Sequence, residues 1–187
     1  TTYLDTENKD YYFQHHQGKP KRHKVRFRNY IESDLSFLEV KLKHKGTTDK
    51  KRISTPFSFP MSKNQEAFLQ EWIPENPADL KQILQNTFSR ITLAHKTEEE
   101  RVTIDFNLKF EDQNSKVDLS EPIIIEVKQT GLNRNSKINT LLRSKQIRSQ
   151  RLSKYCIGCI LLDDKLKYNR FKSRLLDLNK IQKIWNF

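Results

Sequence analysis

The chain has 187 residues, and its 35 Lys and Arg outnumber 23 Asp and Glu, which gives a formal net charge of +12. Its 11 Phe, 6 Tyr and 2 Trp argue against a disordered chain, and its 4 Gly and 6 Pro exclude collagen-like and low-complexity classes. The length favours a single domain over residues 1–187, and the excess of basic residues predicts a polyanionic partner.

The N-terminal half predicts two strands followed by two helices. Polar and apolar side chains alternate over residues 24–28 and 37–43, which is typical of strands with one polar face. Ser62 predicts the N-cap of a helix that Pro74 ends. A second helix is expected to follow Pro77, because apolar residues recur there at helical spacing, namely Leu80, Ile83 and Leu84.

The C-terminal half predicts further strands and helices. Alternation continues over residues 88–93, 101–108 and 123–128. Residues 155–162 are apolar on both sides, so we expect a strand covered on both faces. Helical spacing of apolar residues predicts helices over 136–148, whose opposite side is basic, and from about 171 to 185.

Charged side chains lie on the polar face of one predicted strand after another. Closing such a sheet would line a lumen with charge, and a positive lumen is costly unless a polyanion or a metal fills it. We therefore expect an α+β fold, an antiparallel β-barrel with helices packed outside and the ligand inside. A flat sheet with a solvated polar face is the alternative.

Other constellations carry weaker signals. Cys156 and Cys159 have the spacing of a redox or zinc pair, but on a strand the two thiols would lie on opposite faces. His15, His16 and His23 fall in a basic turn, where we expect them to be solvated. The chain has no glycine-rich phosphate loop, so phosphate would be held by side chains.

Targeting signals are not visible in the sequence. The longest apolar run, Cys156 to Leu162, has seven residues, whereas a membrane-spanning helix needs about 20. The first residues resemble no secretion signal, and two cysteines suit a reducing compartment. We expect a cytoplasmic protein without a transmembrane segment, and association with the inner face of a membrane through a partner stays open.

Seven short motifs follow one another along the chain, at residues 3–6, 16–19, 24–30, 37–41, 101–105, 125–128 and 153–158. Together they resemble the bacterial form of the VTC domain, the polyphosphate polymerase domain of the vacuolar transporter chaperone family. The resemblance implies the triphosphate tunnel metalloenzyme fold, in which an eight-stranded antiparallel barrel surrounds a triphosphate. Members of the family begin with a further strand that contributes a lysine, and this chain starts after that strand.

The resemblance also implies roles for residues at matching positions. The expected catalytic residues, which would grip phosphates in the tunnel, are Arg26, Arg28, Lys41, Arg90 and Lys154. Phe88 replaces a tyrosine that the family has two residues before the arginine at position 90. Further phosphate-binding residues are expected on basic strand faces and in a basic-x-Ser-Lys element, and they are Lys24, Lys43, Arg101, Lys128, Arg151 and Ser153.

Two carboxylates are candidates for a divalent metal. Glu126 matches the family's metal-holding carboxylate, and oxygen ligands of this kind suit Mn²⁺ or Mg²⁺. Read from residue types alone, Glu126 could instead form an ion pair with Lys128 or with an arginine of a neighbouring strand. Glu39 is a second metal candidate and could equally be the partner of an internal arginine.

Three functions fit these observations. The leading hypothesis is a metal-dependent polyphosphate polymerase that transfers the γ-phosphate of ATP to a growing polyphosphate chain, with ATP and inorganic polyphosphate as its partners. One alternative is hydrolysis of tripolyphosphate or a nucleoside triphosphate in the same tunnel. Another is a non-catalytic polyanion-binding module, although no specific nucleic-acid partner is expected.

Overall fold

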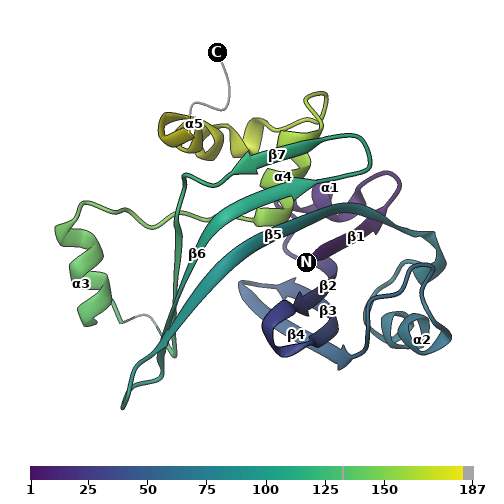
Figure 1. Cartoon of the computed structure of the whole chain (residues 1–187), viewed down its shortest axis with the longest axis horizontal. Coiled ribbons are helices and arrows are strands. Elements are labelled where there is room, and N and C mark those ends of the chain that lie inside the picture. The colour runs from purple at the N-terminus through teal and green to yellow at the C-terminus, as the bar shows by residue number, and fades with distance from the viewer. Residues whose placement is uncertain (132, 183–187) are drawn as a thin grey trace. The chain divides into compact units, whose positions relative to one another are not determined.

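The computed structural model describes residues 1–131 and 133–182. In these residues five helices accompany an eight-stranded antiparallel sheet, which confirms the predicted α+β class (Figure 1). The strands are β1 (Thr2–Thr6), β2 (Arg22–Tyr30), β3 (Leu35–His44), β4 (Thr47–Ser54), β5 (Leu80–Ala94), β6 (Glu100–Glu111), β7 (Lys116–Leu119) and β8 (Ile124–Gln129). The helices are α1 (Asp10–Gln17), α2 (Lys63–Trp72), α3 (Lys137–Ser144), α4 (Lys154–Leu162) and α5 (Lys172–Gln182), and 3₁₀ turns span 31–33, 77–79 and 169–171.

The chain forms two compact units. Unit 1 comprises residues 1–86, 110–117 and 154–172. Unit 2 comprises the described residues of 87–109, 118–153 and 173–187. Strand β5 begins in unit 1 and ends in unit 2, and strand β6 begins in unit 2 and ends in unit 1. The prediction of a single domain over residues 1–187 stays a prediction.

The order of the strands corrects the predicted barrel. Hydrogen bonding runs β4-β3-β2-β1-β5-β6-β7, with β8 paired to β6, so the sheet of the described residues is open. β1 is an interior strand, because it pairs with both β2 and β5. Edge strand β4 carries Lys50, Lys51 and Arg52, and charge of this kind discourages further pairing at a sheet edge.

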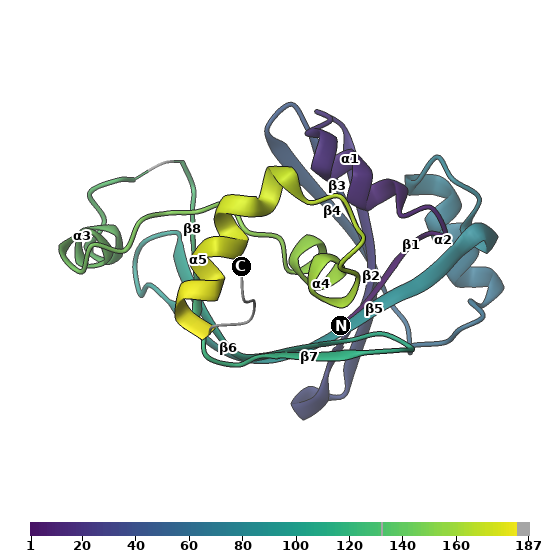
Figure 2. The same ribbon diagram turned by 90° about the horizontal axis from the view of Figure 1, so that it is seen from above.

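Unit 1 is built around a buried carboxylate on β1. Asp5 is fully buried and accepts hydrogen bonds from the backbone amides of Tyr11, at 2.9 Å, and Tyr12, at 3.0 Å. These amides lie in the first turn of α1, whose N-cap residue Lys9 has no side-chain cap, so Asp5 satisfies donors that the helix leaves unpaired. The hydroxyl of Tyr155, on α4, also donates to Asp5, and helices α1 and α4 accordingly pack together (Figure 2).

The segment predicted as a buried strand at 155–162 is helix α4. A helix that is apolar on all sides and a strand covered on both faces have the same uniform pattern, so periodicity does not separate them. Gly158 allows the helix to approach its neighbours, because a Cβ at this position would lie 2.6 Å from the Phe110 ring. Cys156 and Cys159 are therefore three residues apart on a helix, both buried, instead of on opposite faces of a strand.

The helix predicted after Pro77 is also wrong. A 3₁₀ turn spans Pro77–Asp79, and residues from Leu80 onward form β5. Leu80 and Leu84 are both buried, and their spacing of four residues fits one turn of a helix, whereas in β5 an irregularity lies between them, where the pairing with β1 shifts between Tyr3 and Leu4. Tertiary pairing decides between the two, since these leucines lie opposite Thr6 and Tyr3 of β1.

The other predicted elements agree in position with the structure. Ser62 caps α2 through a capping box with Gln65, and the helix ends two residues before Pro74. The strands predicted at 24–28, 37–43, 88–93 and 101–108 lie in β2, β3, β5 and β6, and the strand predicted at 123–128 corresponds to β8, which begins one residue later. The helix predicted over 136–148 corresponds to α3, which ends four residues earlier. The end of the helix predicted to run to 185 lies outside the described residues. Within the described residues, no helix has the length and apolar character needed to cross a membrane.

Candidate phosphate-binding site

Unit 1 carries a strongly basic sheet face on strands β2, β3 and β4. Residues directly opposite each other in the antiparallel ladder share a face, and the register pairs Lys24 with Lys41 and Lys41 with Lys50. The same face therefore holds eight bases, namely Arg22, Lys24, Arg26, Arg28, Lys41, Lys43, Lys50 and Arg52. We call these eight residues the basic face. Glu39 is the one acid among the strand residues that share it.

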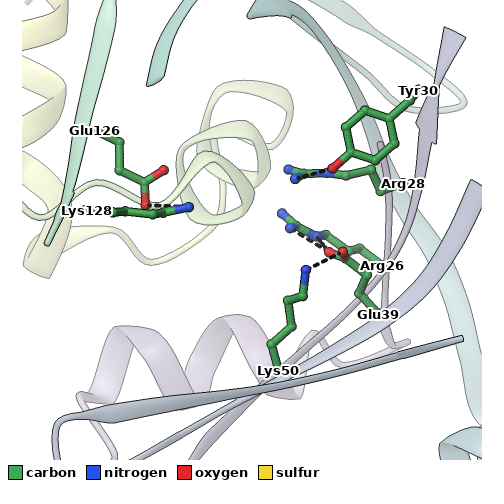
Figure 3. A network of polar contacts seen from close by, with 7 residues as sticks. All are labelled: Arg26, Arg28, Tyr30, Glu39, Lys50, Glu126 and Lys128. Atoms are coloured by element: carbon green, nitrogen blue, oxygen red, sulfur yellow. Dashed lines mark hydrogen bonds and ion pairs between the residues drawn. The ribbon is translucent and has the colours of Figure 1, made fainter. Parts of the chain in front are cut away.

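Glu39 holds Arg26 in a fixed position. The Nε and Nη2 atoms of Arg26 both donate to Oε2 of Glu39, at 2.8 and 2.7 Å, and Nζ of Lys50 donates to Oε1 at 3.0 Å (Figure 3). Burial acts to raise the pKa of the fully buried Glu39 side chain, but the charge of Arg26 and the hydrogen bonds from Lys50 and Arg26 lower it to about 2. Both carboxylate oxygens are thus engaged by cations of the basic face.

Arg28 lies on the same face, one position further along the alternation of β2. Its Nη1 atom is 3.4 Å from the hydroxyl of Tyr30, and its guanidinium carbon is 5.8 Å from the centre of the Tyr30 ring. Figure 3 shows the guanidinium groups of Arg26 and Arg28 pointing into the same space. Two planar forks side by side present several N–H donors in a geometry that suits phosphate oxygens.

The basic face continues toward helices α1 and α4. Burial lowers the pKa of Lys24, and the neighbouring charges of Arg26 and Arg22 lower it further. His15 lies on α1 with its Nδ1 atom 2.7 Å from Sγ of Cys156, and burial together with the charge of Lys24 lowers the pKa of His15 to about 3. His15 is therefore neutral at pH 7 and packed in unit 1, which corrects the expectation of a solvated histidine.

The histidines at 16 and 23 need the same correction. His23 is buried at 4% exposure on β2, and His16 lies on α1 with its ring near Phe171.

Lys154, at the start of α4, is half-buried and belongs to unit 1, whereas the preceding Ser153 is buried and belongs to unit 2.

In unit 2, Arg90 of β5 is held by a carboxylate of β6. Its Nε and Nη2 atoms donate to the two oxygens of Asp105 at 2.5 and 2.7 Å, and its guanidinium carbon lies 5.2 Å from the centre of the Phe88 ring. Asp105 is buried while Arg90 is partly exposed, so the carboxylate fixes the orientation of a guanidinium that remains partly accessible to solvent. Asp105 is thus the ion-pair partner of an arginine.

Strand β8 completes a second polar face in unit 2. The register pairs Thr103 with Glu126 and Arg101 with Lys128, so these four side chains share a face. Nζ of Lys128 is 3.6 Å from Oε1 of Glu126, and about half of each side chain is exposed. This is the ion pair that residue types alone suggested for Glu126. The buried hydroxyl of Thr103 has no hydrogen-bond partner among the described residues.

The remaining predicted residues are spread over the two units. Arg151 is exposed, in a shallow hollow of unit 2 that Asp177 also lines. Unit 1 brings together Lys24, Arg26, Arg28, Lys41 and Lys43, and unit 2 brings together Arg101, Glu126 and Lys128. Their convergence on one lumen stays a prediction. Among the described residues, no cluster of three or more His, Cys, Asp or Glu side chains is placed to hold a metal ion.

Sequence reasoning missed two bases of the site, Lys50 and Arg52. They lie on β4, a strand that was not predicted; six of its eight residues are exposed. The alternation of Lys50 and Arg52 with Lys51 and the half-buried Ile53 is a signal that could have located them.

Comparison with known proteins gives a family and a fold. The VTC domain matches the chain over residues 1–163. A crystal structure from Bacillus halodurans, described as a putative adenylate cyclase, superposes with a TM-score of 0.53 at 14% sequence identity. The match covers 82% of this chain and 76% of that one, which at this identity shows a shared fold. The comparison with curated proteins gave no match.

Proposed function

The chain belongs to the VTC domain family, of the triphosphate tunnel fold, and we propose that it is a metal-dependent polyphosphate polymerase acting on ATP. The observation that carries this proposal is the basic face, where eight Lys and Arg surround one acid on three adjacent strands. Such a density of cations needs an anion of many charges to offset its self-repulsion. A chain of phosphates supplies that charge with regular spacing.

The reaction moves a phosphoryl group between two phosphate oxygens. The bond between Pγ and the bridging oxygen of ATP breaks, a terminal oxygen of the polyphosphate bonds to Pγ, and ADP leaves. Catalysis of this kind depends mainly on positioning and on neutralising charge over the phosphate oxygens. Arg26, preorganised by Glu39, and Arg28, flanked by Tyr30, supply donors for these oxygens.

Several lysines act beside these arginines. Lys24, Lys41, Lys43 and, from the start of α4, Lys154 supply point charges that can follow the phosphates of a longer chain. In unit 2, Arg90, Arg101 and Lys128 supply further positive charges for phosphate. Arg151 and Ser153 precede Lys154 in the sequence. Lys154 would therefore contact phosphate as part of a basic-x-Ser-Lys element.

A divalent metal fits Glu126 better than Glu39. The Glu126 carboxylate is half-exposed, its ion pair with Lys128 is loose at 3.6 Å, and the facing Thr103 hydroxyl lacks a partner in the described part of the chain. This is an oxygen donor set of the kind that Mg²⁺ or Mn²⁺ uses when phosphates complete its coordination. A cation held by Glu126 would neutralise phosphate oxygens. Glu39, with both oxygens engaged, is better suited to orienting Arg26.

The test is a product analysis. The chain is incubated with ATP and either Mn²⁺ or Mg²⁺, and polyphosphate, ADP and free phosphate are assayed separately. We expect polyphosphate to form together with ADP, and Arg28→Ala to suppress both products. Arg148→Ala, which removes an exposed arginine outside both polar faces, is the matched control and should retain activity.

Each alternative function has a different result in this assay. Free phosphate without polyphosphate would replace the polymerase with a triphosphatase, in which water takes the place of the phosphate chain as acceptor. Binding of tripolyphosphate without turnover under either metal would identify a polyanion-binding module.

A further inference from the structure

Helix α3 has an apolar side that the described residues of the chain leave partly exposed. None of its residues is buried, and Leu141 is 52% exposed. Ile138, Leu141 and Leu142 recur at spacings of three and four, so they form one stripe along the helix. Figures 1 and 2 both show α3 standing clear of the strands of its unit.

The end of α3 adds a fourth apolar side chain to this stripe. Gln146 has a left-handed conformation with φ of 58°. The amide of Gln146 donates to the carbonyl of Arg143, and the amide of Ile147 donates to the carbonyl of Leu142. This pair of bonds is a Schellman motif, which turns the residue after the left-handed position back toward the third-last helical residue. Ile147, 50% exposed, is thereby brought back toward Leu142.

The start of α3 is anchored to the sheet of unit 2. The side chain of Ser136 accepts a hydrogen bond from the Asn139 amide and another, at 2.8 Å, from Nε2 of Gln129 at the end of β8. Asn139 also donates to the side-chain oxygen of Gln129 at 3.3 Å. The hydrogen bonds therefore fix the orientation of α3 at the end of β8, and none of the residues of its apolar stripe is buried by the described part of the chain.

The charged residues of the segment that carries the stripe all have one sign. Residues 127–153 include seven Lys and Arg and no Asp or Glu. Lys137, Arg143, Lys145 and Arg148 lie on α3 or directly after it, and all four are exposed. An apolar stripe bordered by exposed cations matches the interface of an anionic bilayer, where acyl chains lie beneath negative headgroups.

We propose that α3, with Lys145 to Arg148, docks on the surface of an anionic lipid membrane. Leu141, Leu142 and Ile147 enter the boundary between headgroups and acyl chains, and the flanking cations contact lipid phosphates. A free polyanion such as polyphosphate would use the same cations and would leave the apolar stripe in water. An anionic lipid surface accounts for both the exposed cations and the apolar stripe. This inference does not depend on the proposed enzymatic activity.

The experiment measures binding of the chain to vesicles of phosphatidylcholine alone and of phosphatidylcholine mixed with phosphatidylglycerol. We expect binding to the mixed vesicles only. Each basic residue near an anionic surface contributes roughly a five-fold gain in partitioning, so Lys145→Ala with Arg148→Ala should weaken binding by about 25-fold. The matched control, Lys96→Ala with Lys180→Ala, removes two exposed lysines of unit 2 elsewhere and should change binding little.

The apolar stripe is tested separately from the charge. Leu141→Ser should weaken binding to mixed vesicles about five-fold or more, whereas Ile123→Ser removes an exposed apolar side chain directly before β8 and should not. Leu141→Trp keeps the stripe apolar and adds a reporter. Its fluorescence should shift to shorter wavelength on mixed vesicles and be quenched by lipids brominated on their acyl chains.

Three results would overturn the proposal. One is the absence of binding to mixed vesicles, and another is equal binding to both vesicle types. The third is loss of binding in the charge variant with no effect of Leu141→Ser and no quenching of the tryptophan reporter, which would assign the segment to soluble polyanions. Formation of polyphosphate from ATP is measured without vesicles in the same variants, so failure here and failure of the proposed function are distinguishable.

Discussion

Glu39→Gln removes the one acid from the basic face while keeping the shape of the side chain. In the native chain the pKa of Glu39 lies at about 2 against an ordinary value of 4.5. At about 1.4 kcal/mol per unit of pKa, this difference corresponds to roughly 3 kcal/mol of stability at pH 7. The variant leaves the buried Arg26 without its charged partner, and breaking such a pair costs an amount of this size.

The pH dependence has a definite sign. Because the folded-state pKa of Glu39 is depressed, its contribution is complete above pH 4.5 and is lost as the pH falls through about 2. Urea unfolding of both proteins should therefore give a difference of about 3 kcal/mol at pH 7 and about half of that at pH 3. Glu121→Gln, at an exposed glutamate, is the control and should change stability by less than about 0.5 kcal/mol.

Tripolyphosphate links this stability difference to the site. An anion on the basic face would replace the charge of Glu39 beside Arg26, so tripolyphosphate should raise the melting temperature of Glu39→Gln more than that of the native chain. A stability loss that is the same at pH 7 and pH 3 would refute the assigned charge of Glu39. An equal effect of tripolyphosphate on both proteins would show that phosphate does not reach Arg26.

Three further variants test the site and the core. Arg28→Ala should lower tripolyphosphate affinity about ten-fold or more in a calorimetric titration, because a charge-assisted contact is lost. The control Arg148→Ala should have little effect. Equal losses of affinity in the two variants that disappear together at high salt would contradict this prediction. Glu126→Gln should abolish metal-dependent turnover and leave tripolyphosphate binding largely intact, and unchanged turnover would restrict Glu126 to its ion pair with Lys128. Gly158→Ala should destabilise the chain by about 1–3 kcal/mol in urea, since its Cβ would press on Phe110, and a neutral effect would mean that α4 can shift.

The sequence by itself determined the features that depend on local geometry. Alternation over 24–28, 37–43 and 101–108 predicted strands and the side on which Arg26, Arg28 and Lys41 lie. The cap at Ser62 was likewise readable, because a capping box involves only neighbouring residues. Since side chains on a strand must alternate between two faces, the basic character of the β2–β3 face follows from the order of the residues alone.

Only the tertiary structure decided the identity of the uniformly apolar and the strongly polar segments. Residues 155–162 became helix α4 because Asp5 binds the Tyr155 hydroxyl and Gly158 admits Phe110, contacts with residues far away in the sequence. Strand β4 forms because its backbone pairs with β3, although Ile53 is the one apolar residue in its sequence and most of its residues are exposed.

The ion-pair partners of Arg26 and Arg90 were also decided only by the tertiary structure. Glu39 faces Arg26, and Asp105 binds Arg90, across ladders whose register is not written in either strand. A shift of the register by one residue would turn every side chain of a strand to its other face without altering the sequence of that strand. The ion pairs of the candidate site are therefore properties of the assembled sheet, because packing across strands selects one register from several that the local patterns allow.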